Sequence, residues 1–267
     1  MKILDKIVEE KRKEVEERQS LYPVKLLEQS VYYESPTVSM CNYLTGAGRS
    51  GIIAEFKRRS PSKGDINRHA DAGKVTLGYM QAGASALSVL TDAKFFGARS
   101  GDITEARRLN FCPLLRKEFI IDPYQVIESR SMGADTLLLI ARILKPDVVT
   151  ELANLARSLG MEVLLELHDR REAEESYMGD VDLVGINNRD LDTFEVNTER
   201  SIELAEMLPA EMVKVAESGI ESTATIVMLR EHGFRGFLIG ELFMREANPA
   251  ARCRELIREL ERADGAR

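Results

Sequence analysis

Short runs of hydrophobic, often β-branched residues recur from residue 50 onward and alternate with longer stretches of helical periodicity. Their starts are spaced by roughly 20 to 35 residues, the length of one strand plus one helix. Several runs, such as TLLLI and EVLLEL, are almost continuously apolar, which is typical of strands buried on both faces of a parallel sheet. The predicted strands are Gly51–Lys57, Ala86–Asp92, Pro113–Phe119, Thr136–Arg142, Glu162–His168, Leu183–Arg189, Met212–Ser218 and Phe237–Phe243.

Helix signals lie between these runs. Asp122 and Asn248 each precede a proline, Pro146 follows a lysine, and a proline at the first helical position is favoured. Glycines that are expected to follow helix ends are Gly133, Gly179 and Gly233. Eight strand–helix units predict an α/β fold, a closed (β/α)8 barrel. A doubly wound open sheet is the alternative, but the segment EFKRRS after the first strand does not resemble its Gly-rich turn.

Residues 1–49 precede the first predicted strand. Ile3, Ile7, Val8 and Val15 predict a partly amphipathic helix, and a second helical stretch surrounds Val24–Leu27. No long linker rich in Pro, Gly or Ser follows them. We therefore expect residues 1–267 to form a single barrel domain, with 1–49 as a helical N-terminal extension packed on the barrel.

Composition narrows the possible partners and the compartment. Hydrophobic residues make up 44% of the 267 residues, enough for a full core, which excludes global disorder. The 37 Lys and Arg against 44 Asp and Glu give a net charge of −7, so no nucleic-acid or membrane partner is expected. Three scattered cysteines and three distant histidines argue against a metal site. The charged N-terminus lacks a signal-peptide pattern, and a cytoplasmic location is expected.

Charged side chains gather at the ends of the predicted strands. Alternation along a strand places residues i and i+2 on one face, and the pairs formed in this way are Glu55 and Lys57, Lys117 and Phe119, Glu166 and His168, and Asn187 and Arg189. Two lysines and two glutamates that face one cavity can neutralise each other and supply general acids and bases. A structural ion pair is the alternative for Lys117 and Glu166, because the pattern does not fix which face points inward.

A phosphate site is predicted from an independent pattern. Ser218 and Gly219 follow the seventh strand, and Gly240 and Glu241 lie on the eighth. Many barrels bind phosphate with the loops after these two strands, where glycines let backbone N–H groups approach an anion. A simple turn is the alternative for either glycine.

The basic run from Lys57 to Lys63 lies in the loop after the first strand. We interpret it as a lid that attracts a small polyanion, with a solvated loop or a nucleic-acid patch as the alternatives. His168 and His232 are both interpreted as structural residues.

Taken in order, eight segments resemble the strand-end motifs of the indole-3-glycerol-phosphate synthase family. They are IIAEFKRRSPSKG, ALSVLTDAKFFG, PLLRKEFIID, GADTLLLIARIL, VLLELHD, VGINNRDLDTFEV, VAESGI and FLIGELFM. The resemblance implies a (β/α)8 barrel of tryptophan biosynthesis. It also implies conversion of 1-(2-carboxyphenylamino)-1-deoxyribulose 5-phosphate to indole-3-glycerol phosphate, CO₂ and water, without a metal or an organic cofactor.

The resemblance also implies roles for individual residues. Lys117 would be the principal general acid and Glu166 the general base, and Glu55 and Lys57 would form a supporting ion pair that contacts substrate. Hydroxyl and carboxylate groups of the substrate would be held by Asn187, Arg189 and Ser60. The aromatic ring would pack against Phe96, Phe119 and Leu138. The phosphate would be contacted by Ser218, Gly219, Gly240 and Glu241.

Two departures from the family pattern stand out. Ala98 and Arg99 follow Gly97 where the family usually has a Gly-Ser pair, which questions a hydroxyl contact from that loop. After Gly240 the sequence continues with Glu241 and Leu242, where a small or hydroxyl residue often follows, although backbone N–H groups would still bind phosphate.

Two other functions remain open. One is another phosphate-binding barrel enzyme such as phosphoribosylanthranilate isomerase, but Cys112 opens its strand at the wrong end for a Cys/Asp pair. The other is a non-catalytic barrel that binds a phosphorylated metabolite, which would not need paired Lys and Glu. The expected partner is a small anionic substrate, and the expected oligomeric state is a monomer, with a weak dimer as the alternative.

Overall fold

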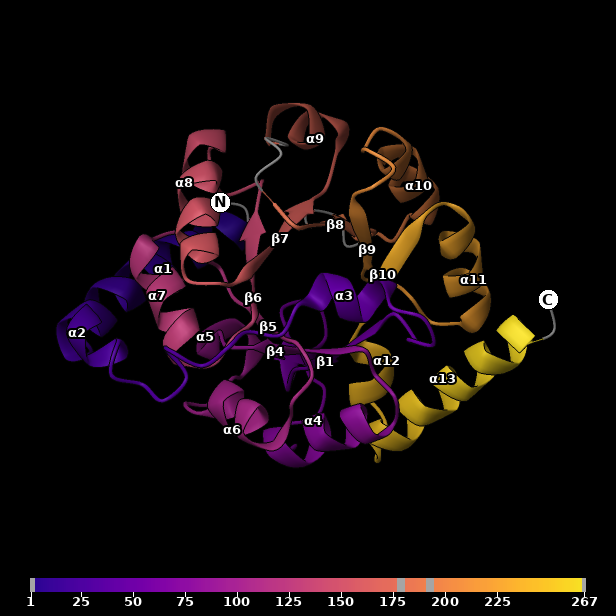
Figure 1. Cartoon of the computed structure of the whole chain (residues 1–267), viewed down its shortest axis with the longest axis horizontal. Helices are drawn as coiled ribbons and strands as arrows, with labels where there is room; N and C mark the ends of the chain where they lie inside the picture. Colours follow the sequence, from indigo (N-terminus) through magenta and orange to yellow (C-terminus); the bar gives the residue numbers. More distant parts are fainter. Residues whose placement is uncertain (1–2, 177–180, 191–194, 266–267) are drawn as a thin grey trace.

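A computed structural model describes residues 3–176, 181–190 and 195–265. Eight parallel strands close into a barrel in the order β1-β10-β9-β8-β7-β6-β5-β4, with helices outside it (Figure 1). The predicted (β/α)8 barrel is confirmed. Its strands are β1 (Ile52–Phe56), β4 (Ala86–Leu90), β5 (Leu114–Lys117), β6 (Thr136–Ile140), β7 (Glu162–Leu167), β8 (Leu183–Asn187), β9 (Val213–Glu217) and β10 (Phe234–Ile239).

Helices alternate with these strands along the chain. The longer ones are α4 (Ala72–Gln81), α6 (Asp102–Leu109), α7 (Pro123–Ser131), α8 (Pro146–Ser158), α9 (Arg170–Ser176), α10 (Thr198–Glu206), α11 (Thr223–Glu231) and α13 (Pro249–Gly265), and the short ones are α5 (Ala93–Phe96) and α12 (Glu241–Met244). The three predicted proline starts are confirmed. Gly133 and Gly233 follow α7 and α11 with positive φ, and Gly179 lies outside the described residues. Within the described ranges, no helix combines the length and the apolar character needed to cross a bilayer.

The barrel interior is filled by one apolar residue from each strand. These residues are Ile53, Ala86, Leu115, Leu138, Leu164, Leu183, Val215 and Leu238. Since side chains alternate along a strand, the residue two positions later points into the same interior, closer to the carboxyl end. On five strands that residue is Glu55, Lys117, Glu166, Glu217 or Gly240. The packing therefore decides what the sequence pattern left open, namely which face of each strand points inward.

The structure differs from the prediction in the last strand and in the loop after the first. The last strand runs over Phe234–Ile239 and not over Phe237–Phe243, because its pairing with β1 ends at Ile239 and Phe243 lies in α12. The loop after β1 contains a two-stranded hairpin of β2 (Arg59–Ser60) and β3 (Gly64–Asp65), which the sequence pattern did not predict.

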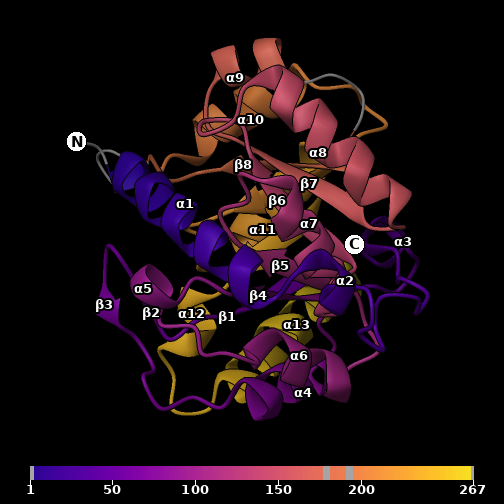
Figure 2. The ribbon, with the colours of Figure 1, turned by 90° about the vertical axis from the view of Figure 1, so that its left-hand side faces the viewer.

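The N-terminal extension contains α1 (Ile3–Leu21), α2 (Val24–Leu27) and α3 (Met40–Thr45). Met40 and Leu44 of α3 are buried against the interior residues, and α3 lies across the middle of the ring of strands in Figure 1. The start of α1 and α3 lie toward opposite sides of the molecule in Figure 2. The extension thus contacts both ends of the barrel.

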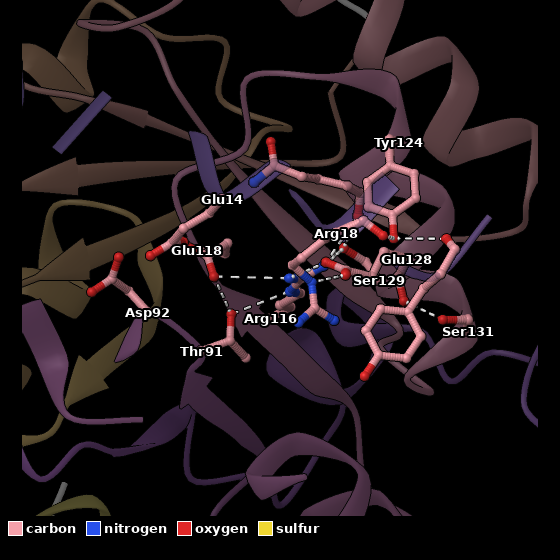
Figure 3. Close-up of polar contacts among 12 residues, drawn as sticks. Glu14, Arg18, Thr91, Asp92, Arg116, Glu118, Tyr124, Glu128, Ser129 and Ser131 are labelled. Carbon is pink, nitrogen blue, oxygen red and sulfur yellow. Dashed lines mark hydrogen bonds and ion pairs between the residues drawn. The ribbon is translucent and has the colours of Figure 1, made fainter. Parts of the chain in front are cut away.

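Buried charges attach α1 to the barrel. Lys11 Nζ lies 2.9 Å from Asp92 and 3.0 Å from Glu118, and all three side chains are almost fully buried. Nearby, Arg116 of β5 pairs with Glu128 of α7 at 2.6 Å, within the polar network drawn in Figure 3. Arg18 of α1 pairs with the same Glu128, so the network joins α1, β5 and α7.

Candidate active site

One cavity of about 200 Å³ opens at the carboxyl ends of the strands. Ile3, Leu4 and Ile7 of α1 form part of its wall. All the site residues predicted from the sequence also line it: Glu55, Lys57, Ser60, Phe96, Lys117, Phe119, Leu138, Glu166, Asn187, Arg189, Ser218, Gly219, Gly240 and Glu241. Fourteen residues from distant parts of the chain therefore meet in the place where barrels of this class bind ligands.

Lys117 is the centre of the charged cluster. Its Nζ lies 2.9 Å from Oε2 of Glu166 and also pairs with Glu217. Asn187 donates from Nδ2 to Oε1 of Glu166 at 3.1 Å. Both oxygens of the Glu166 carboxylate are thus held by donors, so its orientation in the cavity is fixed.

Lys57 and Glu55 form a second ion pair in the same cavity, with Nζ 2.7 Å from Oε1. A Cβ at Gly240 would overlap Oε1 of Glu55, so the absence of a side chain at Gly240 makes room for this carboxylate. The cavity therefore holds two ammonium groups beside carboxylates, as the strand-end pattern predicted.

The charges in the cluster change each other's proton affinity. Burial alone would lower the pKa of Lys117, but the carboxylates of Glu166, Glu217 and Glu55 outweigh burial and raise it. Burial alone would raise the pKa of Glu166, but Lys117 and His168 hold it well below its usual value. Lys117 is therefore an ammonium and Glu166 a carboxylate at neutral pH.

Glu217 is a site residue that the sequence analysis missed. Its carboxylate is buried, and burial together with the charge of Glu166 raises its pKa to about 7 against the opposing effect of Lys117. A Cβ at Gly185 of β8 would overlap Oε1 of Glu217, so this glycine provides the space for the carboxylate. The available signal was alternation, because Glu217 lies two residues after the inward-facing Val215.

An apolar wall faces the charged cluster. The rings of Phe96 and Phe119 lie 6.0 Å apart at an interplanar angle of 38°. Leu138 belongs to the same apolar cluster. A planar aromatic group would fit against such a wall, with its polar substituents toward the lysines.

The loop after β9 has a special backbone. Ser218 has φ +66°, and among the described residues it is the one non-glycine residue with positive φ; Gly219 follows with φ +68°. Asn188 donates from Nδ2 to the Ser218 carbonyl at 2.7 Å and holds this conformation. Such strain is typical of ligand-binding turns.

Glu241 is an acidic residue at this end of the cavity, which Glu221 also lines. The Glu241 carboxylate lies 3.5 Å from Lys63 and 4.0 Å from Arg189. Two cationic side chains therefore flank the predicted phosphate position. Arg189, which the family resemblance assigns to hydroxyl and carboxylate groups of the substrate, thus contacts Glu241 at this end.

The side chains of the basic run after β1 differ in exposure, so the run is not a uniformly solvated loop. Arg58 is buried and donates from Nη2 to Asp102 at 2.9 Å, so it anchors the hairpin to α6. Arg99, at the departure from the family pattern, donates its backbone N–H to Asp102 at 2.7 Å. Arg59, by contrast, has an exposed side chain.

The two histidines differ. His232 caps the C-terminal end of α11, is exposed, and lies 3.9 Å from Glu206, as a structural residue would. His168 is buried behind the cavity, with Nε2 3.0 Å from Oε1 of Glu166. The interpretation of His168 as purely structural is incomplete, because it touches a carboxylate of the site.

Sequence comparison places these residues in a family context. The family model described as "Indole-3-glycerol phosphate synthase" matches residues 4–256. A protein of that name from Bacteroides thetaiotaomicron is 44% identical over 260 residues, which cover 97% of this chain and 99% of that protein. A protein of the same name from Burkholderia vietnamiensis is 41% identical over 251 residues, 93% of this chain and 96% of that one.

Solved structures share the architecture at low sequence identity. Thiamine phosphate pyrophosphorylase from Pyrococcus furiosus aligns with a TM-score of 0.61 and 14% identity over 84% of this chain and 98% of that one. Tryptophan synthase subunit alpha from Legionella pneumophila aligns with a TM-score of 0.59 and 10% identity over 81% and 93%. At these identities the likeness shows the barrel fold alone.

Proposed function

The chain belongs to the indole-3-glycerol phosphate synthase family, and from this premise we propose how its residues carry out the reaction. The enzyme is a carboxy-lyase of tryptophan biosynthesis. It closes a ring in 1-(2-carboxyphenylamino)-1-deoxyribulose 5-phosphate and releases CO₂ and water to give indole-3-glycerol phosphate.

The two ends of the cavity orient the substrate. Backbone N–H groups at Gly219, Gly240 and Glu241 bind the phosphate, with Ser218 in the same turn. The aromatic ring packs against Phe96, Phe119 and Leu138. Arg189 and Ser60 hold polar groups of the substrate, and this binding at both ends folds the flexible ribulose chain so that the reacting carbons meet.

Lys117 is the general acid of ring closure. The ring carbon that bears the carboxylate attacks the C2′ carbonyl, and negative charge develops on the carbonyl oxygen. A nearby ammonium can give this oxygen a proton and stabilise the charge. The observation that carries this assignment is that Lys117 lines the cavity, paired with the Glu166 carboxylate, and keeps its positive charge there.

Glu166 is the general base of dehydration, with Asn187 holding its orientation. In the resting site its proton affinity is low because the Lys117 ammonium is adjacent. Once Lys117 has given up its proton, that opposing charge is gone and Glu166 becomes a stronger base. Lys57, paired with Glu55, is a second candidate acid for the leaving hydroxyl.

The test is turnover of the carboxyphenylamino substrate by the purified protein, followed by indole fluorescence. Product formation without added metal or cofactor is expected. Turnover of phosphoribosylanthranilate instead would favour the isomerase alternative, and binding without turnover would favour a non-catalytic barrel.

We also propose that the protein acts as a monomer in the cytoplasm, with a weak dimer as the alternative. The scattered cysteines support this location. Light scattering after size exclusion, over a range of protein concentrations, tests the oligomeric state.

A further inference from the structure

His168 lies between two carboxylates that belong to different elements. Its Nε2 is 3.0 Å from Oε1 of Glu166 on β7, and its Nδ1 is 3.2 Å from Oε2 of Glu172 on α9. The ring is almost fully buried and is not part of the cavity wall. A neutral imidazole carries one N–H, whereas an imidazolium carries two and can face a carboxylate on each side.

The contacts continue toward the surface. Glu172 accepts the backbone N–H of His168 at 2.7 Å, and Arg142 donates from Nε to the other oxygen of Glu172 at 2.7 Å. Arg142 also pairs with Asp169 at 2.8 Å. A charged His168 is therefore balanced by Glu166 and Glu172, and Glu172 is balanced in turn by Arg142.

Two glutamates contact Lys117, and their surroundings differ. Glu166 accepts hydrogen bonds from Lys117 and Asn187. His168 Nε2 lies 3.0 Å from its Oε1, at ion-pair distance but outside hydrogen-bond geometry, so His168 acts on Glu166 through its charge. Glu217 also contacts Lys117, but its Oε1 is buried without a hydrogen-bond partner among the described residues. The negative charge of Glu217 is therefore balanced by fewer contacts than that of Glu166. Because an unbalanced buried charge is costly, Glu217 is the carboxylate that gains more from taking up a proton.

We propose that His168 is a positioning residue whose imidazolium keeps Glu166 ionised and fixed in orientation, which leaves Glu217 as the glutamate beside Lys117 that takes up a proton. This inference rests on the proposed function. It adds a reason why the two glutamates beside Lys117 differ in proton affinity. The proton affinities agree with the geometry. Burial lowers the pKa of His168, but Glu166 and Glu172 outweigh burial and raise it to about 9.

With Glu166 ionised and Glu217 able to carry a proton, every proton of the reaction can be assigned a donor and an acceptor. Lys117 gives one proton to the C2′ oxygen at ring closure and one to the departing hydroxyl, which leaves as water. Glu166 takes one proton from the substrate at dehydration and returns it to Lys117. The substrate carboxylate leaves as neutral CO₂, so each turnover consumes one proton, which passes from Glu217 to Lys117 and is replaced on Glu217 from solvent.

The charge state of His168 can be measured directly. The chain has three histidines, so ¹⁵N-histidine labelling gives few imidazole signals, and His69→Asn and His232→Asn assign the third by elimination. In the wild-type enzyme without substrate, the His168 ring is expected to keep both protons up to a pH of about 9. A neutral ring at pH 7 would overturn the proposal, and this readout does not depend on any activity.

The positioning role is tested with His168→Asn, with His232→Asn as the matched control. Wild type and control are expected to share one pH profile of kcat between pH 8 and pH 6, without a loss of activity toward pH 6. In the variant, kcat at pH 8 falls by about tenfold or more while KM changes by less than about threefold, since His168 does not line the cavity. At pH 6 its kcat falls further, because Glu166 now takes up a proton there.

A purely structural histidine gives a different result. It would lower the thermal midpoint and the folded fraction but leave the pH profile per folded molecule unchanged, and that outcome would overturn the proposal. If His168→Asn fails to fold, the pH profile of His168→Gln and the histidine titration of the wild-type protein still test the proposal. If the wild-type protein does not turn over the substrate at all, the proposed function fails, and the charge state of His168 is still measured by the titration.

Discussion

At the scale of single residues, Lys117 has the largest predicted effect on activity. Lys117→Met keeps the length of the side chain but removes the ammonium between Glu166 and Glu217. We expect kcat to fall by about 100-fold or more, with substrate binding retained, because the proton donor to the C2′ oxygen is lost. Single-turnover fluorescence measures the effect, and Lys145→Met, an exposed lysine before α8, is the control. Turnover within a fewfold of wild type would reject the assignment of Lys117.

Glu217 is expected to affect how stability depends on pH. Its pKa in the folded protein is about 7, above the usual value of 4.5, so between these values the folded state binds more protons than the unfolded state. The stability cost of Glu217 is therefore absent below pH 4.5 and complete above pH 7. Glu217→Gln removes this cost, and its free energy of unfolding relative to wild type should rise between pH 5 and pH 8 by roughly 1–3 kcal/mol. Urea unfolding at both pH values measures it, and parallel curves for the two proteins would contradict the shifted pKa.

At the scale of elements, β8 provides the space in which Glu217 lies. A Cβ at Gly185 would overlap Oε1 of Glu217 and approach Leu164. Gly185→Ala should therefore displace the carboxylate and lower kcat, while the backbone of β8, which needs no positive φ at this position, is retained. Kinetics together with the pH dependence of unfolding measure the effect. Gly265→Ala at the end of α13, where a Cβ meets nothing, is the control. An unchanged kcat would mean that Glu217 can move without loss of function.

The attachment of α1 depends on one buried cation. Lys11→Met leaves Asp92 and Glu118 without the ammonium that lies 2.9 Å and 3.0 Å away. We expect a loss of about 3 kcal/mol in the free energy of unfolding and faster amide exchange in α1, since the remaining carboxylates stay buried. Lys13→Met removes an exposed lysine of the same helix and should change stability by less than about 0.5 kcal/mol. Equal effects of both variants would show that the buried contacts do not hold α1.

The elements were predictable to different degrees for physical reasons. Strands buried on both faces produce continuous apolar runs, and prolines mark helix starts, so the barrel follows from the sequence. The hairpin around Ser60 contains too few residues for a periodic pattern. The shift of the last strand arose because Leu242 and Phe243 are as apolar as the strand before them, and only the pairing of Ile239 with β1 locates its end.

The site was less predictable than the fold, because its geometry depends on contacts between strands. Alternation placed Glu55, Lys117 and Glu166 on faces but did not say which faces were internal. The interior packing supplies that information. Alternation paired His168 with Glu166, but it could not reveal the second contact, with Glu172 on the following helix.

At the scale of the whole molecule, the charge distribution has consequences for substrate capture. The chain carries a net charge of −7, yet Arg59, Arg68 and Arg99 line a second pocket beside the hairpin that follows β1. Arg59 and Arg68 share one carboxylate, Asp65, at 3.8 Å and 3.9 Å. This pocket is therefore positive on an otherwise acidic protein. Such a field attracts an anionic substrate from solution, and the attraction is weakened by salt.

Replacing Arg59, Arg68 and Arg99 together by Gln should lower kcat/KM at low ionic strength by about tenfold and flatten its salt dependence, while kcat stays unchanged. The control replaces Arg235, Arg258 and Arg262, exposed residues at the start of β10 and on α13, and makes the same change in net charge. Stopped-flow measurement of substrate binding at a series of salt concentrations compares the two triple variants. If both triple variants lose kcat/KM equally, the net charge governs capture. A loss confined to the first variant means that the local field beside the hairpin does so, since hairpin residues Ser60, Pro61 and Ser62 also line the cavity.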